Sequence, residues 1–365
     1  AYFKKYGEYP PFFFLVSPTM ACDLRCTGCY AWKYPKEKSL SGEKLDQIIT
    51  EAKEEMGIYF VAITGGEPTY WPPLEEIVQK HNDCFFLMYT HGQRIDDAMA
   101  ERFARYGNIY PAISIEGDEA LTDKRRGKGA YQKVLAAMDR LRTRGVLFGF
   151  SLTHTRQNHD YACSEDFINT MIEHGAAFGW VFQYIPVGRD PELSMVPTAE
   201  QRLERRKAIH RIRKEKPILV YDFWNDGDSV DGCIAWGRKY VHITAQGYVE
   251  PCVFVHFAQD SIHEKSLGEC LRSSSFREAR ALQPFTKDLR MPCPQIDHPH
   301  ILRGLVEKHG MKPTHEGAEG IITRHYDALC QVAAQYRQAL DADDRRHQGE
   351  NQCTTRAAAV AAAER

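Results

Sequence analysis

The sequence predicts an α/β fold, a partial (β/α)6 TIM-like barrel with a smaller C-terminal α+β module, and three observations support this. Six short β-rich segments alternate with helical patterns from residue 12 to about residue 215, as in stacked βα units with a parallel sheet. Six units are too few for a closed eight-stranded barrel. After residue 216 the pattern changes to a hairpin, so we expect a second module there.

The strands are expected over 12–17, 58–64, 84–90, 109–115, 146–154 and 179–185. The helix between the first two shows how regular the alternation is, because Ser41 can cap its start and Gly57 can stop it. Its apolar stripe consists of Leu45, Ile48, Ile49, Ala52 and Met56.

Four regions follow along the chain. We expect the barrel over residues 1–215 and the smaller module over 216–312, where Gln246 and Gly247 supply a hairpin turn. Region 313–342 contains a predicted helix over 314–341. The last region, 343–365, is polar and then alanine-rich, so we expect it to be loosely attached or disordered.

Composition narrows the possible functions. A net charge of -2 gives no bulk electrostatic support for binding nucleic acid or a membrane surface. The longest apolar run, residues 10–20, is too short to span a membrane, and no charged leader precedes it, so we expect a buried strand. Eleven cysteines in a chain of 365 residues indicate a reducing, cytoplasmic compartment in which thiols bind metal or pack in the core.

The most informative segment contains Cys22, Cys26 and Cys29 in a polar loop after the first strand. Iron–sulfur clusters are normally held by four thiolates, so three would leave one iron of a 4Fe–4S cluster without a protein ligand. An open coordination position suits catalysis, as in catalytic zinc sites. Two alternatives remain: a zinc site completed by a distant Cys or His, and thiols that only pack in the core.

This loop resembles the cluster motif of the radical S-adenosylmethionine (SAM) superfamily, C-x3-C-x2-C followed by an aromatic residue, here Tyr30. After the second strand, Gly65, Gly66, Glu67 and Pro68 resemble the GGE motif of that family. The resemblance implies that the glycines let the backbone approach the methionine amino group of SAM, which Glu67 would also contact.

Further positions match in order. Ser114 and Glu116 resemble the segment that binds the SAM ribose, and Arg126 resembles a residue that meets the SAM carboxylate. Each also has a plain alternative: Ser114 only ends a strand, Glu116 caps the next element, and Arg126 is a solvated charge. The family often has TNG after the third strand and an aspartate in the ribose segment, whereas this chain has His91 within THG, and Glu116.

The resemblance covers about residues 12–190 and implies the chemistry. An electron donor such as a flavodoxin or ferredoxin reduces the 4Fe–4S cluster, and SAM bound at the open iron is cleaved to methionine and a 5'-deoxyadenosyl radical. That radical takes hydrogen from an unactivated carbon, while the protein positions the reactants and excludes water.

In the smaller module, Cys233, Gly247 and Cys252 resemble the opening C-x9-15-G-x4-C of SPASM and Twitch auxiliary-cluster domains. The remaining cysteines of the full SPASM pattern are missing, and only Cys270 and Cys293 follow. Cys293 lies between two prolines and is the better ligand candidate, whereas Cys270 falls on an apolar helical face typical of a core thiol.

The resemblance therefore implies one auxiliary 4Fe–4S cluster, completed by Cys270 or a histidine, or left open for substrate. The candidate histidines are His256, His298 and His300, each of which is more often a surface or hydrogen-bonded residue.

Three functions remain. The first is a radical SAM enzyme that oxidises, crosslinks or joins an unactivated carbon of a peptide-like or small-molecule substrate. The second applies the same chemistry to a lipid or another apolar chain. The third is a noncatalytic iron–sulfur or zinc protein for electron transfer or scaffolding, which would not require the motifs at the ends of the second and fourth strands.

Overall fold

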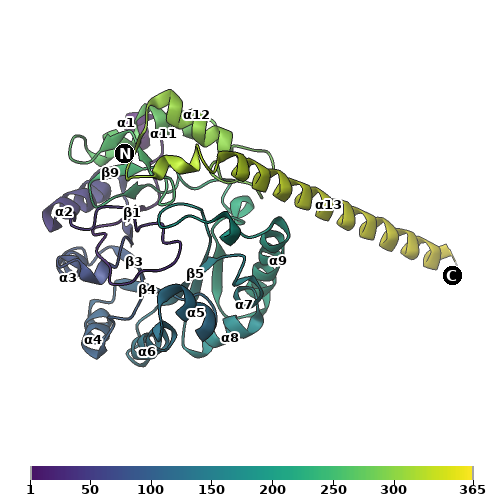
Figure 1. The fold of residues 1–365 in the computed structure, drawn as a ribbon, viewed down its shortest axis with the longest axis horizontal. Coiled ribbons are helices and arrows are strands. Elements are labelled where there is room, and N and C mark those ends of the chain that lie inside the picture. Colours follow the sequence, from purple (N-terminus) through teal and green to yellow (C-terminus); the bar gives the residue numbers. More distant parts are fainter. Residues whose placement is uncertain (1, 364–365) are drawn as a thin grey trace.

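The computed structural model describes residues 2–363 and the side chains of residues 2–346. Seven parallel strands form the wall of a partial barrel (Figure 1). They are β1 (Phe14–Val16), β2 (Phe60–Ile63), β3 (Phe85–Thr90), β4 (Ile109–Ser114), β5 (Gly149–His154), β6 (Phe178–Gln183) and β7 (Leu219–Asp222). All six predicted strands are present, and β7 is a seventh. Because β7 pairs in parallel with β6, the barrel wall extends past residue 215, where we expected the barrel to end.

Helices cover the outer face of this wall (Figure 1). They are α2 (Gly42–Glu51), α3 (Leu74–Lys80), α4 (Asp97–Tyr106), α5 (Glu119–Arg126), α6 (Ala130–Thr143), α7 (His159–Ala162), α8 (Glu165–Glu173) and α9 (Ala199–Glu215), with α1 (Tyr2–Tyr6) at the N-terminus. The prediction for α2 is confirmed: the Ser41 side chain accepts a hydrogen bond from Lys44 N, and the whole apolar stripe is buried. A π-helical turn, Ala52–Met56, extends α2 as far as Gly57, whose φ of 72° ends it.

The smaller module joins the same sheet. Its hairpin consists of β8 (His242–Ile243) and β9 (Tyr248–Glu250), with Gly247 at a φ of 82° in the turn, as predicted. Strand β8 pairs in parallel with β1, so the hairpin extends the sheet at the edge opposite β7. The module also contains β10 (Phe257–Ala258), β11 (Asp260–Ser261), α10 (Leu267–Leu271), α11 (Ser274–Ala281), α12 (Pro299–His309) and β12 (Lys312–Pro313).

The last helix, α13 (Tyr326–Ala363), differs from the prediction at both ends. It begins at Tyr326 and not at residue 314, because Gly317 adopts a φ of 82° and a separate 3₁₀ turn covers Ala318–Ile321. The helix continues through most of the segment that we expected to be disordered, and residues 364 and 365 lie outside the described residues. Its first half packs on α9, where the Arg202 guanidinium lies 3.9 Å from the centre of the Tyr336 ring.

Successive side chains along each barrel strand point alternately into the core under the helices and into the cavity inside the barrel. In β5, Phe150 and Leu152 belong to the core between sheet and helices, whereas Ser151 and Thr153 face a cavity inside the barrel. This two-residue alternation is the expected consequence of strand geometry. It places polar and aromatic side chains inside the barrel while the helices cover the aliphatic face.

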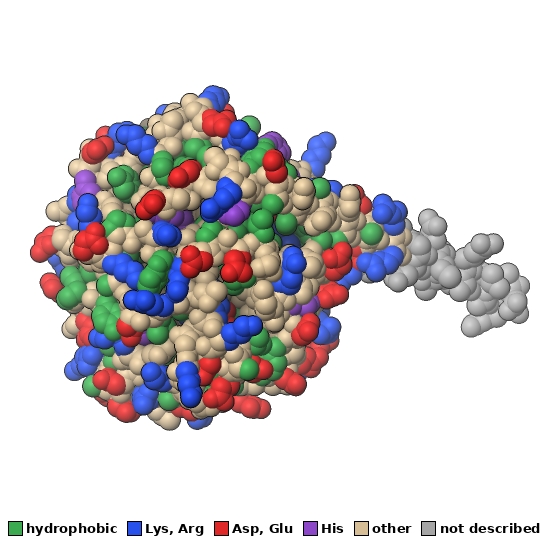
Figure 2. All heavy atoms as spheres, in the orientation of Figure 1, with side chains coloured by type: hydrophobic (Ala, Val, Ile, Leu, Met, Phe, Trp, Pro, Cys, Tyr) green, Lys and Arg blue, Asp and Glu red, His purple; other side chains and the backbone are tan. Residues whose placement is uncertain are grey.

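The surface has no dominant charge on the face drawn in Figure 2, where acidic and basic side chains are interspersed. Among the described residues, no helix has the length and apolar composition needed to cross a membrane.

Candidate active site

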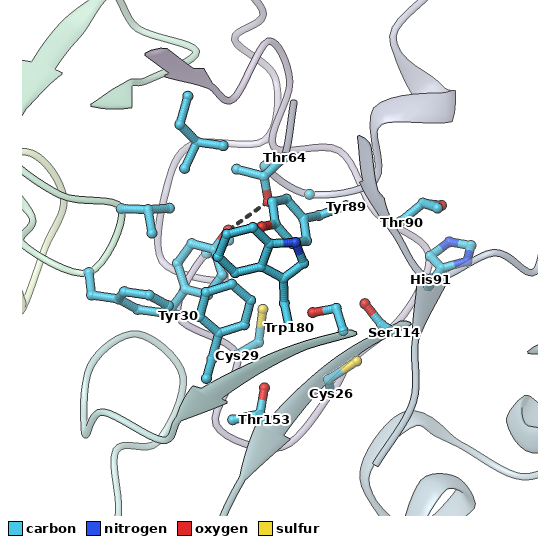
Figure 3. Close-up of a pocket in the computed structure, with 18 of the residues that line it drawn as sticks. Cys26, Cys29, Tyr30, Thr64, Tyr89, Thr90, His91, Ser114, Thr153 and Trp180 are labelled. Atoms are coloured by element: carbon cyan, nitrogen blue, oxygen red, sulfur yellow. Dashed lines mark hydrogen bonds between the residues drawn. The ribbon is translucent and has the colours of Figure 1, made fainter. Parts of the chain in front are cut away.

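The polar segments predicted at the strand ends meet around one cavity of about 180 Å³. The loop after β1 contributes the three cysteines, and the segment after β2 contributes Thr64, Gly65 and Gly66. The end of β3 contributes Thr90 and the following His91, and the end of β4 contributes Ser114. Figure 3 shows these side chains converging from several strands. The arrangement follows from the parallel sheet, whose carboxyl ends lie on the same side.

Cys22, Cys26 and Cys29 all line this cavity. Burial raises the pKa of the Cys22 thiol to about 12, and the two neighbouring thiols contribute to that shift. Burial also raises the pKa of Cys29, with Cys26 as the next cause. Three cysteines in the wall of one cavity fit a thiolate-bound iron–sulfur cluster, since its iron ions would replace the three protons.

Two other potential ligands lie near the first cysteine but are already engaged. The His91 ring and the Asp23 carboxylate have ligand atoms within 4.8 Å of Cys22 Sγ. His91 Nδ1 accepts a hydrogen bond from Gln93 N, so its proton lies on Nε2, which donates to Asp23 Oδ1 at 3.1 Å. His91 therefore offers no free lone pair, and the donor set remains three cysteines.

The two glycines after β2 pack directly against the residues that lead into the cysteine loop. A Cβ on Gly65 would lie 2.3 Å from Thr19 O, and one on Gly66 would lie 2.3 Å from Ala21 O. The backbone hydrogen bonds Gly66 N to Thr19 O and Glu67 N to Ala21 O hold the two loops together. The structure thus gives the glycines a steric reason that we had not predicted, in addition to their place in the cavity wall.

Glu67 is buried and holds the loop after β3 in place. Its Oε1 accepts hydrogen bonds from the Thr69 hydroxyl at 2.8 Å and the Thr90 hydroxyl at 2.7 Å, and its Oε2 accepts from His91 N at 2.9 Å. Neither Glu67 nor Pro68, which begins a 3₁₀ turn, is part of the cavity wall. Their direct contact with SAM stays a prediction, and the observed task of Glu67 is to connect two loops.

Glu116 forms a buried ion pair with both arginines that follow it. Its Oε1 accepts from Arg125 Nη1 at 2.6 Å and from Arg126 Nε at 2.7 Å, while its buried Oε2 has no partner. A buried carboxylate oxygen without a donor is costly, and a ribose hydroxyl would supply one. Ser114 and Arg126 line the cavity, as a SAM-binding role requires, whereas Glu116 does not, and its contact with the SAM ribose stays a prediction.

Aromatic rings form much of the rest of the cavity wall, and Tyr30 is one that the sequence motifs singled out. The Tyr30 hydroxyl lies 2.9 Å from Thr64 Oγ1, an interaction drawn as a dashed line in Figure 3. The Tyr30 ring packs edge-on against Phe254, with 5.3 Å between ring centres. The rings that were missed are Phe13, Phe60, Tyr89, Trp180, Phe182, Phe223, Tyr240 and Phe254. Alternate positions in the predicted strands could have indicated several of them, including Trp180 and Phe182.

The auxiliary candidates Cys233, Cys252 and Cys293 line a second, smaller cavity of about 40 Å³. Burial raises the pKa of Cys252 to about 11 and that of Cys293 to about 12. Phe223 belongs to the walls of both cavities. The three sulfur donors fit an auxiliary cluster next to the main cavity.

Cys270 does not join them, which corrects its inclusion among the metal ligands. It is completely buried in α10 and packs with Leu267, Leu271 and Phe276 in the core between sheet and helices. The plain alternative, a core thiol, is therefore the observed one.

The candidate histidines are also engaged elsewhere or lie outside this cavity. His256 has both ring nitrogens engaged, with Val253 O at 3.0 Å and with His315 Nε2 at 2.7 Å. His298 Nε2 donates to Met291 O, and His300 is exposed. Among the side chains of residues 2–346, the wall of the smaller cavity provides the three cysteines and no histidine or carboxylate.

Known protein families match both regions of the chain that contain the candidate cysteine ligands. The model of the radical SAM superfamily matches residues 16–162, and that of SPASM, an iron–sulfur cluster-binding domain, matches residues 233–295. The mycofactocin maturase MftC of Mycobacterium tuberculosis is 30% identical over 309 residues, which cover 78% of this chain and 75% of that protein. The PqqA peptide cyclase of Gluconobacter oxydans is 25% identical over 261 residues, with coverage of 67% and 70%.

Among solved structures, SuiB of Streptococcus suis bound to S-adenosylmethionine has a similar fold, with a TM-score of 0.67 at 18% identity. The match covers 80% of this chain and 74% of SuiB. It supports the partial barrel with an added module at the level of the fold.

Proposed function

Because this chain belongs to the radical SAM superfamily and carries a SPASM iron–sulfur domain, we propose that it is an enzyme that modifies a peptide at an unactivated carbon. The superfamily supplies its cofactors, SAM and 4Fe–4S clusters. When bound, they provide a 5'-deoxyadenosyl radical that takes hydrogen from the substrate. The peptide as substrate is supported by relatives such as the PqqA peptide cyclase.

The observation that carries this proposal is the position of the cavity. Its wall includes the three cysteines of the β1 loop on one side and Tyr240, Val253 and Phe254 of the auxiliary module on another. A substrate in this cavity would lie between the site of radical formation and the auxiliary site. The aromatic rings would exclude water from the reacting carbon.

Each predicted residue then has a task. Cys22, Cys26 and Cys29 hold the SAM-binding cluster, while Tyr30 and the backbone of Gly65 and Gly66 shape the wall beside it. Ser114, Glu116 and Arg126 bind the ribose and carboxylate of SAM, and Glu67 with Pro68 fixes the loop geometry. Cys233, Cys252 and Cys293 hold the auxiliary cluster.

The cavity wall also supports a second candidate substrate, an apolar chain such as that of a lipid. Among the described residues, those that line the cavity include no aspartate or glutamate, and most are apolar or aromatic. A low-potential donor such as a flavodoxin or ferredoxin would supply the electron, and oxygen-sensitive clusters favour a cytoplasmic location.

The experiment uses isotope transfer to identify the substrate class. The anaerobically reconstituted and reduced enzyme is incubated with SAM and either a perdeuterated cellular peptide fraction or a perdeuterated lipid fraction, and 5'-deoxyadenosine is analysed by mass spectrometry. Deuterium in 5'-deoxyadenosine with the peptides alone supports the proposal, and deuterium with the lipids alone supports the second candidate. The variant with Cys22, Cys26 and Cys29 changed to Ala is the control and should form no 5'-deoxyadenosine.

A further inference from the structure

Tyr240 forms the partition between the main cavity and the auxiliary site. Its ring belongs to the wall of the main cavity, and its hydroxyl lies 2.8 Å from Sγ of Cys252 in the wall of the smaller one. Both residues are buried. Because a cysteine that ligates iron is a thiolate without a proton, the phenol is the donor in this hydrogen bond.

The position of the hydroxyl is fixed by its surroundings. The Tyr240 ring stacks on Phe13 with 5.2 Å between ring centres and an angle of 6° between the ring planes. Its backbone N–H donates to Ile234 O, and its carbonyl accepts from Gly237 N. A donor that is held by packing and by backbone bonds loses little entropy when it binds the sulfur.

The other two cysteines of the auxiliary site differ in this respect. Cys293 Sγ accepts from a backbone group, Gln295 N, at 3.4 Å. Among the described residues, Cys252 is the one of the three whose sulfur receives a hydrogen bond from a side chain. This hydrogen bond therefore depends on Tyr240 and does not follow from the spacing of the cysteines.

Hydrogen bonds to the sulfur ligands help to set the reduction potential of an iron–sulfur cluster. Reduction adds negative charge, and a hydrogen-bond donor stabilises the more negative state. We propose that the Tyr240 hydroxyl, which reaches the auxiliary cluster from the side of the substrate cavity, raises the reduction potential of that cluster. The auxiliary cluster is then more readily reduced. This inference rests on the auxiliary cluster of the proposed function, and it names Tyr240 as the residue that tunes it.

The test measures that potential with the ring packing preserved. Cys22, Cys26 and Cys29 are changed to Ala so that only the auxiliary cluster remains, and Tyr240→Phe is added to this full-length background. Tyr89→Phe is the matched control, because Tyr89 also lines the main cavity and, among the side chains that the structure describes, no cysteine is hydrogen-bonded to its hydroxyl. Iron and sulfide are determined for each protein, and the midpoint potential is measured by EPR-monitored titration.

We expect Tyr240→Phe to retain its iron and to shift the reduction equilibrium roughly threefold to tenfold toward the oxidised state, the range that corresponds to the net contribution of one ordinary hydrogen bond. Tyr89→Phe should leave the midpoint unchanged. Equal midpoints in the Tyr240→Phe protein and its parent would overturn the inference while leaving the auxiliary cluster intact. A parent protein without iron would refute the auxiliary site, and the inference with it.

A second substitution keeps the test decisive if Tyr240→Phe does not assemble its cluster. Site-specific 3,5-difluorotyrosine at position 240 retains the ring and makes the hydroxyl a stronger donor. We expect the midpoint to move in the opposite direction, to a more positive potential. An unchanged midpoint with full iron content would again contradict the proposal, because a purely structural role of the ring is insensitive to donor strength.

Discussion

Nε2 of His91 lies 3.1 Å from Oδ1 of Asp23, and this contact joins the loop after β3 to the loop that carries the three cysteines. Asp23 directly follows the first of these cysteines, Cys22. The backbone N–H of His91 also donates to the buried Glu67 carboxylate. One residue therefore connects the ends of β2 and β3 with the candidate cluster loop.

We expect His91→Phe to retain the iron of the cysteine loop but to weaken SAM binding by up to about tenfold, because the loops lose a partly buried hydrogen bond worth about 0.5–1.5 kcal/mol. The measurement is SAM affinity of the reconstituted protein by equilibrium dialysis. His91→Asn is the control, since it keeps a side-chain donor and restores the family's common residue. Wild-type affinity in His91→Phe would show that the contact has no part in SAM binding.

Glu67→Gln tests the hydrogen bonds by which the buried Glu67 carboxylate joins the loops after β2 and β3. Gln keeps one oxygen, so its N–H₂ group faces either His91 N at the Oε2 position or Thr69 N and the Thr90 hydroxyl at the Oε1 position, and in both orientations a donor faces a donor. We expect a loss of about 2–4 kcal/mol in unfolding free energy in urea. A loss below about 0.5 kcal/mol would contradict the role that we assign to Glu67.

Gly66→Ala tests the close approach of the two loops. Its Cβ would lie 2.3 Å from Ala21 O, so the loop must shift. We expect this strain to lower the free energy of unfolding by about 1–3 kcal/mol. We expect lower iron content and at least about tenfold slower formation of 5'-deoxyadenosine. Gly304→Ala, in α12, is the control, because no atom lies within 4 Å of an added Cβ there. Equal activity of the two variants would refute the steric argument.

Cys270→Ala separates a core thiol from a ligand. We expect its iron and sulfide content to equal that of the wild type, at a cost of about 1 kcal/mol from lost packing. Cys293→Ala should lose the auxiliary cluster, because Cys293 lines the smaller cavity and Cys270 does not. Loss of iron in Cys270→Ala would show instead that this cysteine is a ligand.

The attachment of α13 should depend on acid pH through Asp288. Burial alone would raise the pKa of this carboxyl, but its hydrogen bonds and ion pairs with Arg290 and Arg337 lower it to about 2. A depressed pKa stabilises the fold above the ordinary carboxyl pKa of about 3.9, and the stabilisation is lost as the pH falls toward 2.

Asp288→Asn should therefore cost at most about 2 kcal/mol at pH 7, with the difference from wild type shrinking below pH 4. Urea unfolding of the two apoproteins at several pH values measures this difference. A difference that is the same at pH 7 and pH 3 would rule out the ion pairs as its cause.

The sequence allowed the six strands, the helix α2 and the three-cysteine loop to be predicted, because each depends on neighbours within a few residues. The pairing of β8 with β1 joins residues 15 and 242 and could not be inferred from local patterns. The same holds for the cavity wall, where Phe60, Trp180 and Phe254 meet from distant segments. The sequence already favoured Cys293 as a ligand and Cys270 as a core thiol, and the structure places Cys293 in the wall of the smaller cavity and Cys270 in the core.

The most direct test of the account is the iron content and ⁵⁷Fe Mössbauer spectrum after anaerobic reconstitution, with and without SAM. The wild type is compared with the variant in which Cys22, Cys26 and Cys29 are all changed to Ala. The account predicts about eight irons falling to about four, with one iron site perturbed by SAM in the wild type alone. Zinc in place of iron, or no site that responds to SAM, would contradict it.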